Sequence, residues 1–406
     1  MGISRKASAN LKVKLQVCYL AYHHSDNARN VNYNGNVNYN NQNNQNGVAP
    51  VKEHVSSREV VAAYRNCIRN KRNISGARHF SKNLLKNLAS LKNNLNTNSY
   101  KVSPGYMFVV TWPKPREVWV GNFRDRVVDH LVASRIIPVI TPELHPHNSA
   151  CIKGRGTLFA INKVIECFRK CSGNYAKPVY FLKCDIKNYF TSIDKQVLID
   201  LCNQLALDDF TKALIRTIVT HDCTADTRFL TPYLHHKIPK HKSLINSKTG
   251  IPIGNYLSQI FSGYIYLHQL DRFITEHNYK HYVRYVDDFI ILSESREDLV
   301  QLKCSIDSFL RTKLLVELSV EKSRIYRNEV MFCGRLVKPW RTYAIRRYFH
   351  SILHARNHES LISYAGLIKH SNSYNAWRYC ITNLMEFYNG RTRNQRDCTI
   401  YFRRYL

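Results

Sequence analysis

The sequence predicts an α+β protein in which one sheet is flanked by largely helical segments. Short apolar runs rich in β-forming residues occur at 179–184 (VYFLKC) and at 282–293 (YVRYVDDFIILS). Apolar residues recur at helical spacing through 256–276, between these two runs. Because strands and helices alternate through the middle of the chain, a mixed domain is expected there.

Length and charge narrow the possible classes of function. The 406 residues can bury a substantial core and suggest two or three lobes. There are 60 Lys and Arg against 29 Asp and Glu, a formal charge of +31, and such a field attracts nucleic acid. Charge alone is equally consistent with a ribosome-like or merely soluble basic protein. No apolar run approaches the ~18 residues of a membrane span, so we expect no membrane partner and a cytoplasmic location.

The N-terminal arm, residues 1–50, contains an unusual Asn-rich segment at 26–47. Eleven of its positions are Asn, and the unit N-V-N-Y-N occurs at 30–34 and again at 36–40. So little apolar surface can be buried here that we expect an exposed or mobile loop.

Further elements are predicted in chain order. Helical spacing begins near residue 51, through Val60, Val61, Tyr64, Ile68, Leu84, Leu85, Leu88 and Leu91. Residues 105–120 alternate like two strands around a Pro-containing turn, and 122–140 form an amphipathic helix ended by Pro138. Residues 256–276 form one long helix, and another helix runs through Leu299, Leu302, Ile306 and Phe309.

Three aspartates stand where the predicted strands end. Asp185 follows the first apolar strand, and Asp287 and Asp288 lie at the turn of the predicted hairpin. Taken singly, such residues are more often turn or capping residues. Here hydrophobic strands press two adjacent acids together, which is costly without a cation. The pattern predicts two Mg²⁺ ions about 3.5–4 Å apart, as nucleic-acid chain extension requires.

These residues lie in three segments that resemble reverse transcriptase motifs, in the right order. FLKCDIKNYFTSID resembles motif A, GIPIGNYLSQIF motif B and YVDD at 285–288 motif C. The resemblance, over roughly residues 80–390, implies a right-hand polymerase fold with fingers at 51–180, palm at 181–345 and a short basic helical thumb at 346–406. It also implies synthesis of cDNA from template RNA and dNTPs with two Mg²⁺ ions, or Mn²⁺ in their place.

The resemblance assigns roles at the nucleotide. Lys114 and Arg116 would contact phosphates, and Lys322 in LSVEKSR would be the general acid for pyrophosphate. Phe190 occupies the steric-gate position, where a ring under the sugar excludes a 2′-hydroxyl, although plain core packing is an alternative role. Motif B residues Ile253, Gly254 and Gln259 would line the nucleotide site.

The resemblance also assigns contacts with nucleic acid. Arg155 in SACIKGRGT corresponds more loosely to a template-contacting segment of the fingers, and FCGR at 332–335 resembles the primer grip, with Gly334 and Arg335. Arg346 and Arg347 would begin a thumb that contacts the duplex backbone, with a solvated basic tail as the alternative.

Motif B distinguishes among reverse transcriptases. Ile253 to Gln259 read I-G-x-x-x-S-Q, which resembles the enzymes of diversity-generating retroelements, whereas Q-G-x-x-x-S-P is usual in retroviral and group II intron enzymes. This implies error-prone copying at adenines, a small basic accessory protein, a structured noncoding RNA, and a bacterial or phage gene. An apolar Ile253 removes a directional contact and weakens discrimination, unless it is a neutral core substitution.

The Asn-rich segment gains a second interpretation from this resemblance. Asn codons are AAC and AAT, the kind of codon on which adenine mutagenesis acts in these elements. Under this hypothesis, a template repeat overlaps the start of the reading frame and residues 26–52 are its by-product.

Two alternatives remain at this stage. One is a defence-associated reverse transcriptase with a noncoding RNA. The other is a non-catalytic RNA-binding scaffold, against which stands the joint presence of Asp185, Asp287, Asp288, Phe190 and Lys322.

Overall fold

A computed structural model describes residues 53–345, except 70, 112, 113 and 226, and then 348, 358–375, 377–378 and 381–382. The chain divides into two compact units, Met1–Tyr100 and Lys101–Leu406. The predicted arm at 1–50, its Asn-rich segment, Arg346 and Arg347 lie outside the described residues. The boundaries assigned to fingers, palm and thumb stay predictions.

In the first unit the described residues form three helices, α2 (Ser57–Ile68), α3 (Ser75–Lys82) and α4 (Leu84–Asn96). A capping box starts α2, because the Ser56 hydroxyl accepts from the Glu59 amide while the Glu59 carboxylate accepts from the Ser56 amide. The apolar stripe of α4 is buried at Leu88 and Leu91, whereas Leu85 is exposed. The predicted helical character of this region is confirmed.

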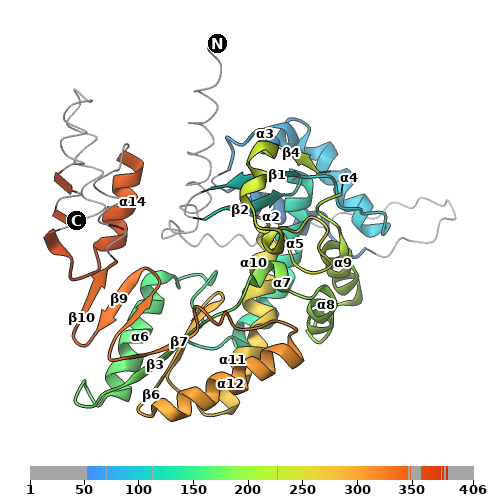
Figure 1. Ribbon diagram of the computed structural model, residues 1–406. Helices are drawn as coiled ribbons and strands as arrows, with labels where there is room; N and C mark the ends of the chain where they lie inside the picture. The colour runs from blue at the N-terminus through green and yellow to red at the C-terminus, as the bar shows by residue number, and fades with distance from the viewer. Residues whose placement is uncertain are drawn as a thin grey trace, which may run out of the picture. The chain divides into compact units, whose positions relative to one another are not determined.

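The second unit is built around a four-stranded antiparallel sheet with strand order β5-β6-β3-β7 (Figure 1). Its strands are β3 (Tyr180–Asp185), β5 (Tyr282–Tyr285), β6 (Asp288–Ser293) and β7 (Arg324–Arg327). The first apolar run of the sequence is β3, and the second forms the β5–β6 hairpin, in which β6 pairs directly with β3. The predicted α+β class is confirmed.

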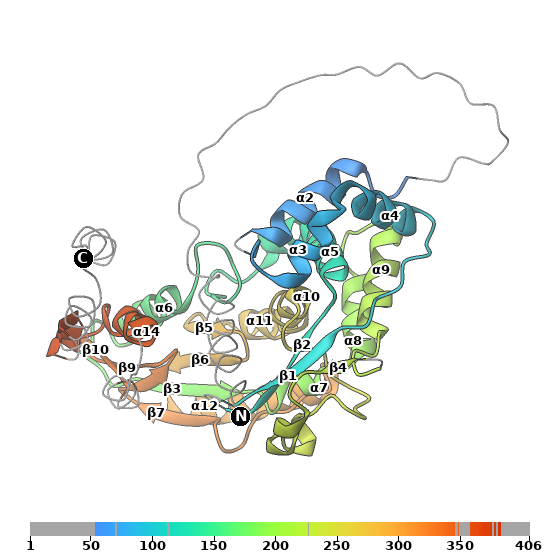
Figure 2. The same cartoon turned by 90° about the horizontal axis from the view of Figure 1, so that it is seen from above.

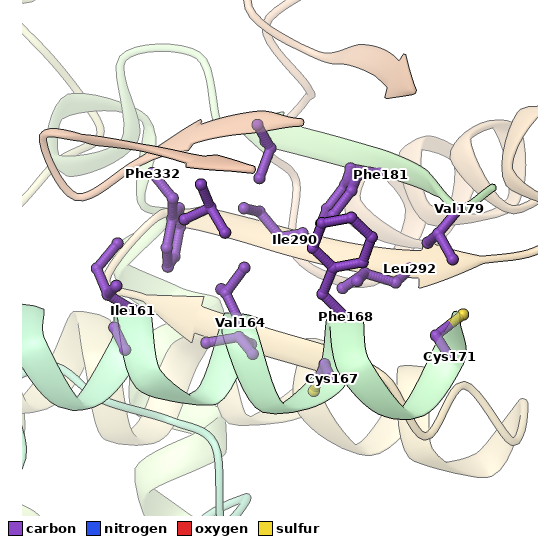
Figure 3. Close-up of a cluster of buried hydrophobic side chains, with 14 residues drawn as sticks. Ile161, Val164, Cys167, Phe168, Cys171, Val179, Phe181, Ile290, Leu292 and Phe332 are labelled. Atoms are coloured by element: carbon purple, nitrogen blue, oxygen red, sulfur yellow. The ribbon is translucent and has the colours of Figure 1, made fainter. Parts of the chain in front are cut away.

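Helix α6 (Thr157–Cys171) covers one face of this sheet. Its Val164 and Phe168 side chains point toward Phe181 of β3 and Ile290 of β6, and Phe332 closes the cluster (Figure 3). Helix α12 (Arg296–Lys313) packs against β3, β6 and β7. The sheet lies between α6 and α12 (Figure 2), so most of the residues on its central strands are buried.

A second sheet, of order β2-β1-β4, carries the predicted Pro-containing hairpin. Its strands are β1 (Tyr106–Val110), β2 (Arg116–Val120) and β4 (Arg228–Phe229). The helix that follows, α5 (Phe123–Ile140), continues past Pro138, so the prediction that Pro138 ends it is wrong. Only the last turn follows Pro138, and Ile140 is buried, which keeps those residues helical.

The predicted long helix at 256–276 is interrupted. It comprises α10 (Tyr256–Ile260), a π-helix (Phe261–Tyr266) and α11 (His268–Glu276). Such wider turns carry one extra residue and are frequent at functional sites. The remaining described helices are α7 (Tyr189–Ser192), α8 (Lys195–Asn203), α9 (Asp209–Thr220), α14 (His358–Ile368) and the short 3₁₀ turns Thr141–Glu143, Pro232–Lys237 and Lys240–Lys242.

The third sheet is a meander of β8 (Val330–Phe332), β9 (Arg335–Lys338) and β10 (Arg341–Ala344). Cys333 and Gly334 both have positive φ, 44° and 77°, as a two-residue hairpin turn requires. Among the described residues no helix is long and apolar enough to cross a membrane.

Candidate active site

Strand pairing brings the predicted acids together. In the β3–β6 ladder Asp185 lies opposite Asp288, and in the β5–β6 hairpin Tyr285 lies opposite Asp288. Directly opposed residues of an antiparallel pair project from the same face. The pairing therefore sets Asp185 beside the hairpin that carries Asp287 and Asp288. Asp288 is the first residue of β6, and only Asp287 lies in the turn itself.

The turn between these strands holds a strained residue. Val286 has φ 57°, in the left-handed region that a β-branched residue rarely adopts. A two-residue hairpin needs positive φ at its first central position, where Gly is usual. Such strain costs of order 1–3 kcal/mol and persists only where the surroundings enforce it.

A buried ion pair holds this turn in its strained conformation. The Arg284 guanidinium is fully buried and pairs with Asp271 of α11, with 2.7 Å between Arg284 Nε and Asp271 Oδ1. Its other nitrogens donate to the Val286 carbonyl at 3.1 Å and to the Gly263 carbonyl in the π-helix at 2.9 Å. One side chain thus ties the turn before Asp287 to two elements of the motif B helix.

Lys322 lies at the end of β3, beside Asp185. Its ammonium forms an ion pair with Oδ1 of Asp185 and is about half exposed. The same segment also holds the Asp185 backbone, because the Ser319 amide donates to the Asp185 carbonyl at 2.8 Å. Lys322 is therefore placed within reach of the reacting groups that Asp185 would face.

A second lysine, Lys183, was not predicted. Its Nζ is 3.3 Å from Oδ2 of Asp288 and donates to the Met331 carbonyl at 2.9 Å. The signal for it was present, because Lys183 is two residues before Asp185 on β3 and so projects from the same face.

Ionisation of the two hairpin acids, Asp287 and Asp288, is opposed by their burial. Burial raises the pKa of Asp287 to about 6, and Asp185 raises it too, while Lys322 and Arg116 act in the opposite direction. Burial raises the pKa of Asp288 to about 7 against the opposing charge of Lys183. For Asp288 desolvation outweighs the nearby lysine. Burial thus opposes ionisation of both carboxyl groups, and that of Asp288 more strongly than that of Asp287.

The site has the chemistry of a divalent cation site, although its acids are turned toward lysines. Within the described residues no group of three His, Cys, Asp or Glu side chains forms a ready-made metal cluster. Asp288 Oδ1 is nevertheless buried without a hydrogen-bond partner among those residues. An unpaired carboxylate oxygen beside two further acids is a donor set that fits Mg²⁺. Asp185, Asp287 and Asp288 would hold the ion after Lys322 and Lys183 turn away.

Phe190 and its neighbour have different environments. Tyr189 is buried, and its hydroxyl donates to the Ser262 carbonyl in the π-helix at 2.6 Å. Phe190 is half-buried, and its carbonyl accepts from the Ile251 amide at 2.9 Å. Only the Phe190 ring is accessible, so of these two residues Phe190 fits the steric-gate position.

The motif B loop lies against β2. The Ile253 carbonyl accepts from the Trp119 amide at 2.7 Å. Gly254 has φ 120°, and a Cβ there would lie 2.6 Å from the Trp119 carbonyl oxygen. Gly254 is therefore required by close backbone approach, and the half-buried Ile253 side chain is held by a fixed backbone.

The other residues predicted to contact the nucleotide or nucleic acid differ in their surroundings, because some are exposed and others form hydrogen bonds within the protein. Lys114 and Arg116 are exposed. The side chain of Gln259 accepts from Cys151 Sγ at 3.5 Å. Arg155 donates to the Asn148 carbonyl at 2.8 Å, and the buried Arg335 donates to the His370 carbonyl at 2.8 Å. Both of these arginines have structural roles, and their contacts with nucleic acid stay predictions. The adjacent Gly334 lies against Tyr348.

An antiparallel sheet with one acid at a strand end and two at the neighbouring hairpin defines a palm-type polymerase domain. Residues 113–337, more than half of the chain, match the family model described as reverse transcriptase (RNA-dependent DNA polymerase). The chain belongs to the reverse transcriptase family, and with it the predicted right-hand polymerase fold is confirmed. No curated protein matches the chain.

Solved structures with similarity to this chain include two yeast telomerases. Telomerase from Candida albicans, in complex with a fragment of telomeric RNA, has a TM-score of 0.43 and 11% identity, and the match covers 70% of this chain and 55% of that one. Apo telomerase from Candida tropicalis, truncated from its C-terminal domain, has a TM-score of 0.39 and 16% identity, over 63% and 59% of the two chains. This chain thus spans little more than half the length of either.

Proposed function

We propose that this protein is an RNA-directed DNA polymerase that extends a primer on template RNA with deoxynucleotides. The observation that carries the proposal is the pairing of Asp185 with Asp288, which brings motif A and motif C together at one end of the two central strands. Lys322, from a third segment, reaches the same end. A scaffold protein would have no need to keep three half-buried carboxylates, those of Asp185, Asp287 and Asp288, together there.

Each group has a task in the reaction. When bound by the three aspartates, divalent ions lower the pKa of the attacking 3′-hydroxyl and neutralise the leaving pyrophosphate. Lys322 Nζ donates a proton to the pyrophosphate oxygen as the bond to the α-phosphorus breaks. Lys114 and Arg116 bind the triphosphate oxygens, and the Phe190 ring lies beneath the sugar.

The test is primer extension on an RNA template with Mg²⁺. Asp287→Asn keeps the size of the side chain and removes a charge needed for the cation. We expect no detectable cDNA and nearly unchanged template affinity. Asp200→Asn, an exposed change on α8, is the matched control and should extend normally. Synthesis by Asp287→Asn near the wild-type rate would remove Asp287 from the site.

We further propose that the enzyme serves a diversity-generating retroelement and copies adenines with errors. The I-G-N-Y-L-S-Q form of motif B and the Asn-rich repeats at 26–47 support this. Its partners would be a structured template RNA and a small basic accessory protein. The test is a search of the flanking DNA for a near-identical copy of the Asn codons that differs at adenines. Absence of such a copy, with a lone operon and noncoding RNA, would favour the defence role.

A further inference from the structure

Residues 227–250, here named the basic platform, carry charge of one sign only. These 24 residues include no Asp or Glu. Their exposed basic side chains are Arg228, His236, Lys237, Lys240, His241, Lys242 and Lys248. None of the five Lys and Arg residues forms an ion pair with a carboxylate in the described part of the chain. A surface of this kind attracts a polyanion.

Side chains on the inner side of the basic platform anchor it to β2. Glu117 of β2 is buried, and its carboxylate accepts from the Leu244 amide at 3.0 Å and lies 2.9 Å from His235 Nε2. Ile238 and Leu244 enter a core cluster with Trp119. The inner side chains therefore hold the segment on the β1–β2 hairpin while the cations face outward.

Both ends of the platform are tied to the candidate active site. At its start, β4 pairs with β1, and the Leu230 amide donates to the Met107 carbonyl at 2.8 Å. At its end the Gly250 amide donates to the Ile193 carbonyl at 2.7 Å, just beyond α7, which carries Phe190. The turns that follow β4, yellow-green in Figures 1 and 2, are thus attached to the hairpin that carries Arg116.

Aromatic side chains are interleaved with the cations. Tyr233 is 70% exposed, and Phe229, whose ring contacts Trp119, is 37% exposed. Cations that track phosphates, together with rings on which bases stack, are the recurrent surface for single-stranded nucleic acid. A duplex offers no free base faces, so the rings favour a single strand.

We propose that the basic platform binds single-stranded RNA, specifically the unpaired template strand that has yet to be copied. The identity of the strand rests on the polymerase function proposed above, whereas the binding itself does not. The lysines contact successive phosphates, and Tyr233 stacks on a base.

The test compares two ligands in a salt series, a blunt RNA–DNA duplex and the same duplex with a 5′ RNA extension of about 12 nucleotides. Lys240→Gln/Lys242→Gln removes two exposed charges. In the wild-type protein the extension increases the affinity for the duplex, and we expect this increase to be about tenfold smaller in the variant. The slope of log affinity against log salt concentration should fall in magnitude by about 1.4. Affinity for the blunt duplex should stay unchanged. Tyr233→Ala should weaken binding of the extension without changing the slope.

The matched control is Lys280→Gln/Lys313→Gln, which removes two exposed charges, one in the loop between α11 and β5 and one at the end of α12. Equal losses in both double variants, or unchanged binding of the extension by Lys240→Gln/Lys242→Gln, would overturn the proposal. Addition of the first nucleotide is measured in the same samples. Its absence in the wild-type protein would contradict the polymerase function, while the binding comparison would still decide the role of the platform.

Discussion

Arg284 and Asp271 form a fully buried ion pair that connects the hairpin of motif C to α11. Through the carbonyls of Val286 and Gly263, the same guanidinium fixes the strained turn and the π-helix. Because Asp287 follows Val286 directly, this pair determines where the Asp287 carboxylate lies.

Asp271→Asn should therefore destabilise the protein and misplace the turn. It leaves a buried guanidinium without its counter-charge, which costs about 3–5 kcal/mol in the free energy of unfolding. Urea unfolding measures the loss. Glu276→Gln on the same helix is the control, because its 3.8 Å contact with Arg272 is exposed and should contribute less than about 1 kcal/mol. If both variants lose equally little stability, the buried pair is not the anchor.

The hairpin acids should give Mg²⁺ a pH-dependent effect on stability. Their folded-state pKa values, about 6 for Asp287 and about 7 for Asp288, lie above the ordinary aspartate pKa of 3.8. The metal-free protein therefore loses stability from this pair as pH rises from about 4 through 7. Mg²⁺ binds the ionised acids, so it should raise Tm strongly at pH 8 and little at pH 5.

Differential scanning fluorimetry with Mg²⁺ and with EDTA at both pH values checks this expectation. In Asp287→Asn the Mg²⁺-induced shift at pH 8 should shrink, and the metal-free Tm should rise because a buried charge is gone. A shift of equal size at pH 5 and pH 8 would show that Mg²⁺ stabilises the protein elsewhere.

Phe190→Ala should open space beneath the sugar and raise the use of ribonucleotides relative to deoxynucleotides by about tenfold or more. Single-nucleotide incorporation assays measure this ratio. Tyr189→Phe is the control, since it removes only the hydrogen bond to Ser262, worth about 1 kcal/mol, from a buried ring. Unchanged discrimination in Phe190→Ala would place the gate at another residue.

Ile253→Gln should lower misincorporation opposite template adenine several-fold. A hydrogen bond from the new amide to the nascent base pair is worth roughly 1 kcal/mol. The backbone bond from Trp119 to the Ile253 carbonyl does not depend on the side chain, so the loop should keep its position. Sequencing of cDNA from one template measures the error rate, with Ile253→Leu as the apolar control. Equal adenine errors in equally stable proteins would separate motif B from fidelity.

The strands and the acids of the site could be predicted because short-range patterns encode them. Alternation marked β1 and β2, and the apolar runs marked β3 and β6, with Asp185 and Asp288 at their ends. The role of Arg284 could not be predicted, because its partner Asp271 lies on a different element and no local sequence pattern pairs the two residues. The π-helix could not be predicted because its apolar spacing resembles that of an α-helix. Its Gly263 and Ser262 carbonyls accept from Arg284 and Tyr189, which lie on other elements.

Asp185 and Asp288 lie opposite each other only in the observed register of β3 and β6, so activity also depends on the packing of these strands in the core. Phe289 to Leu292 are all buried, on alternate faces of a sheet covered on both sides. Sliding β6 by one position along β3 would turn these four side chains over and carry the Asp288 carboxylate to the opposite face. The side chains on each face are fitted to their own neighbours, so close packing selects against a folded form whose acids are out of phase. Heat inactivation should accordingly coincide with melting of the sheet, with no inactive but folded intermediate produced by strand slippage.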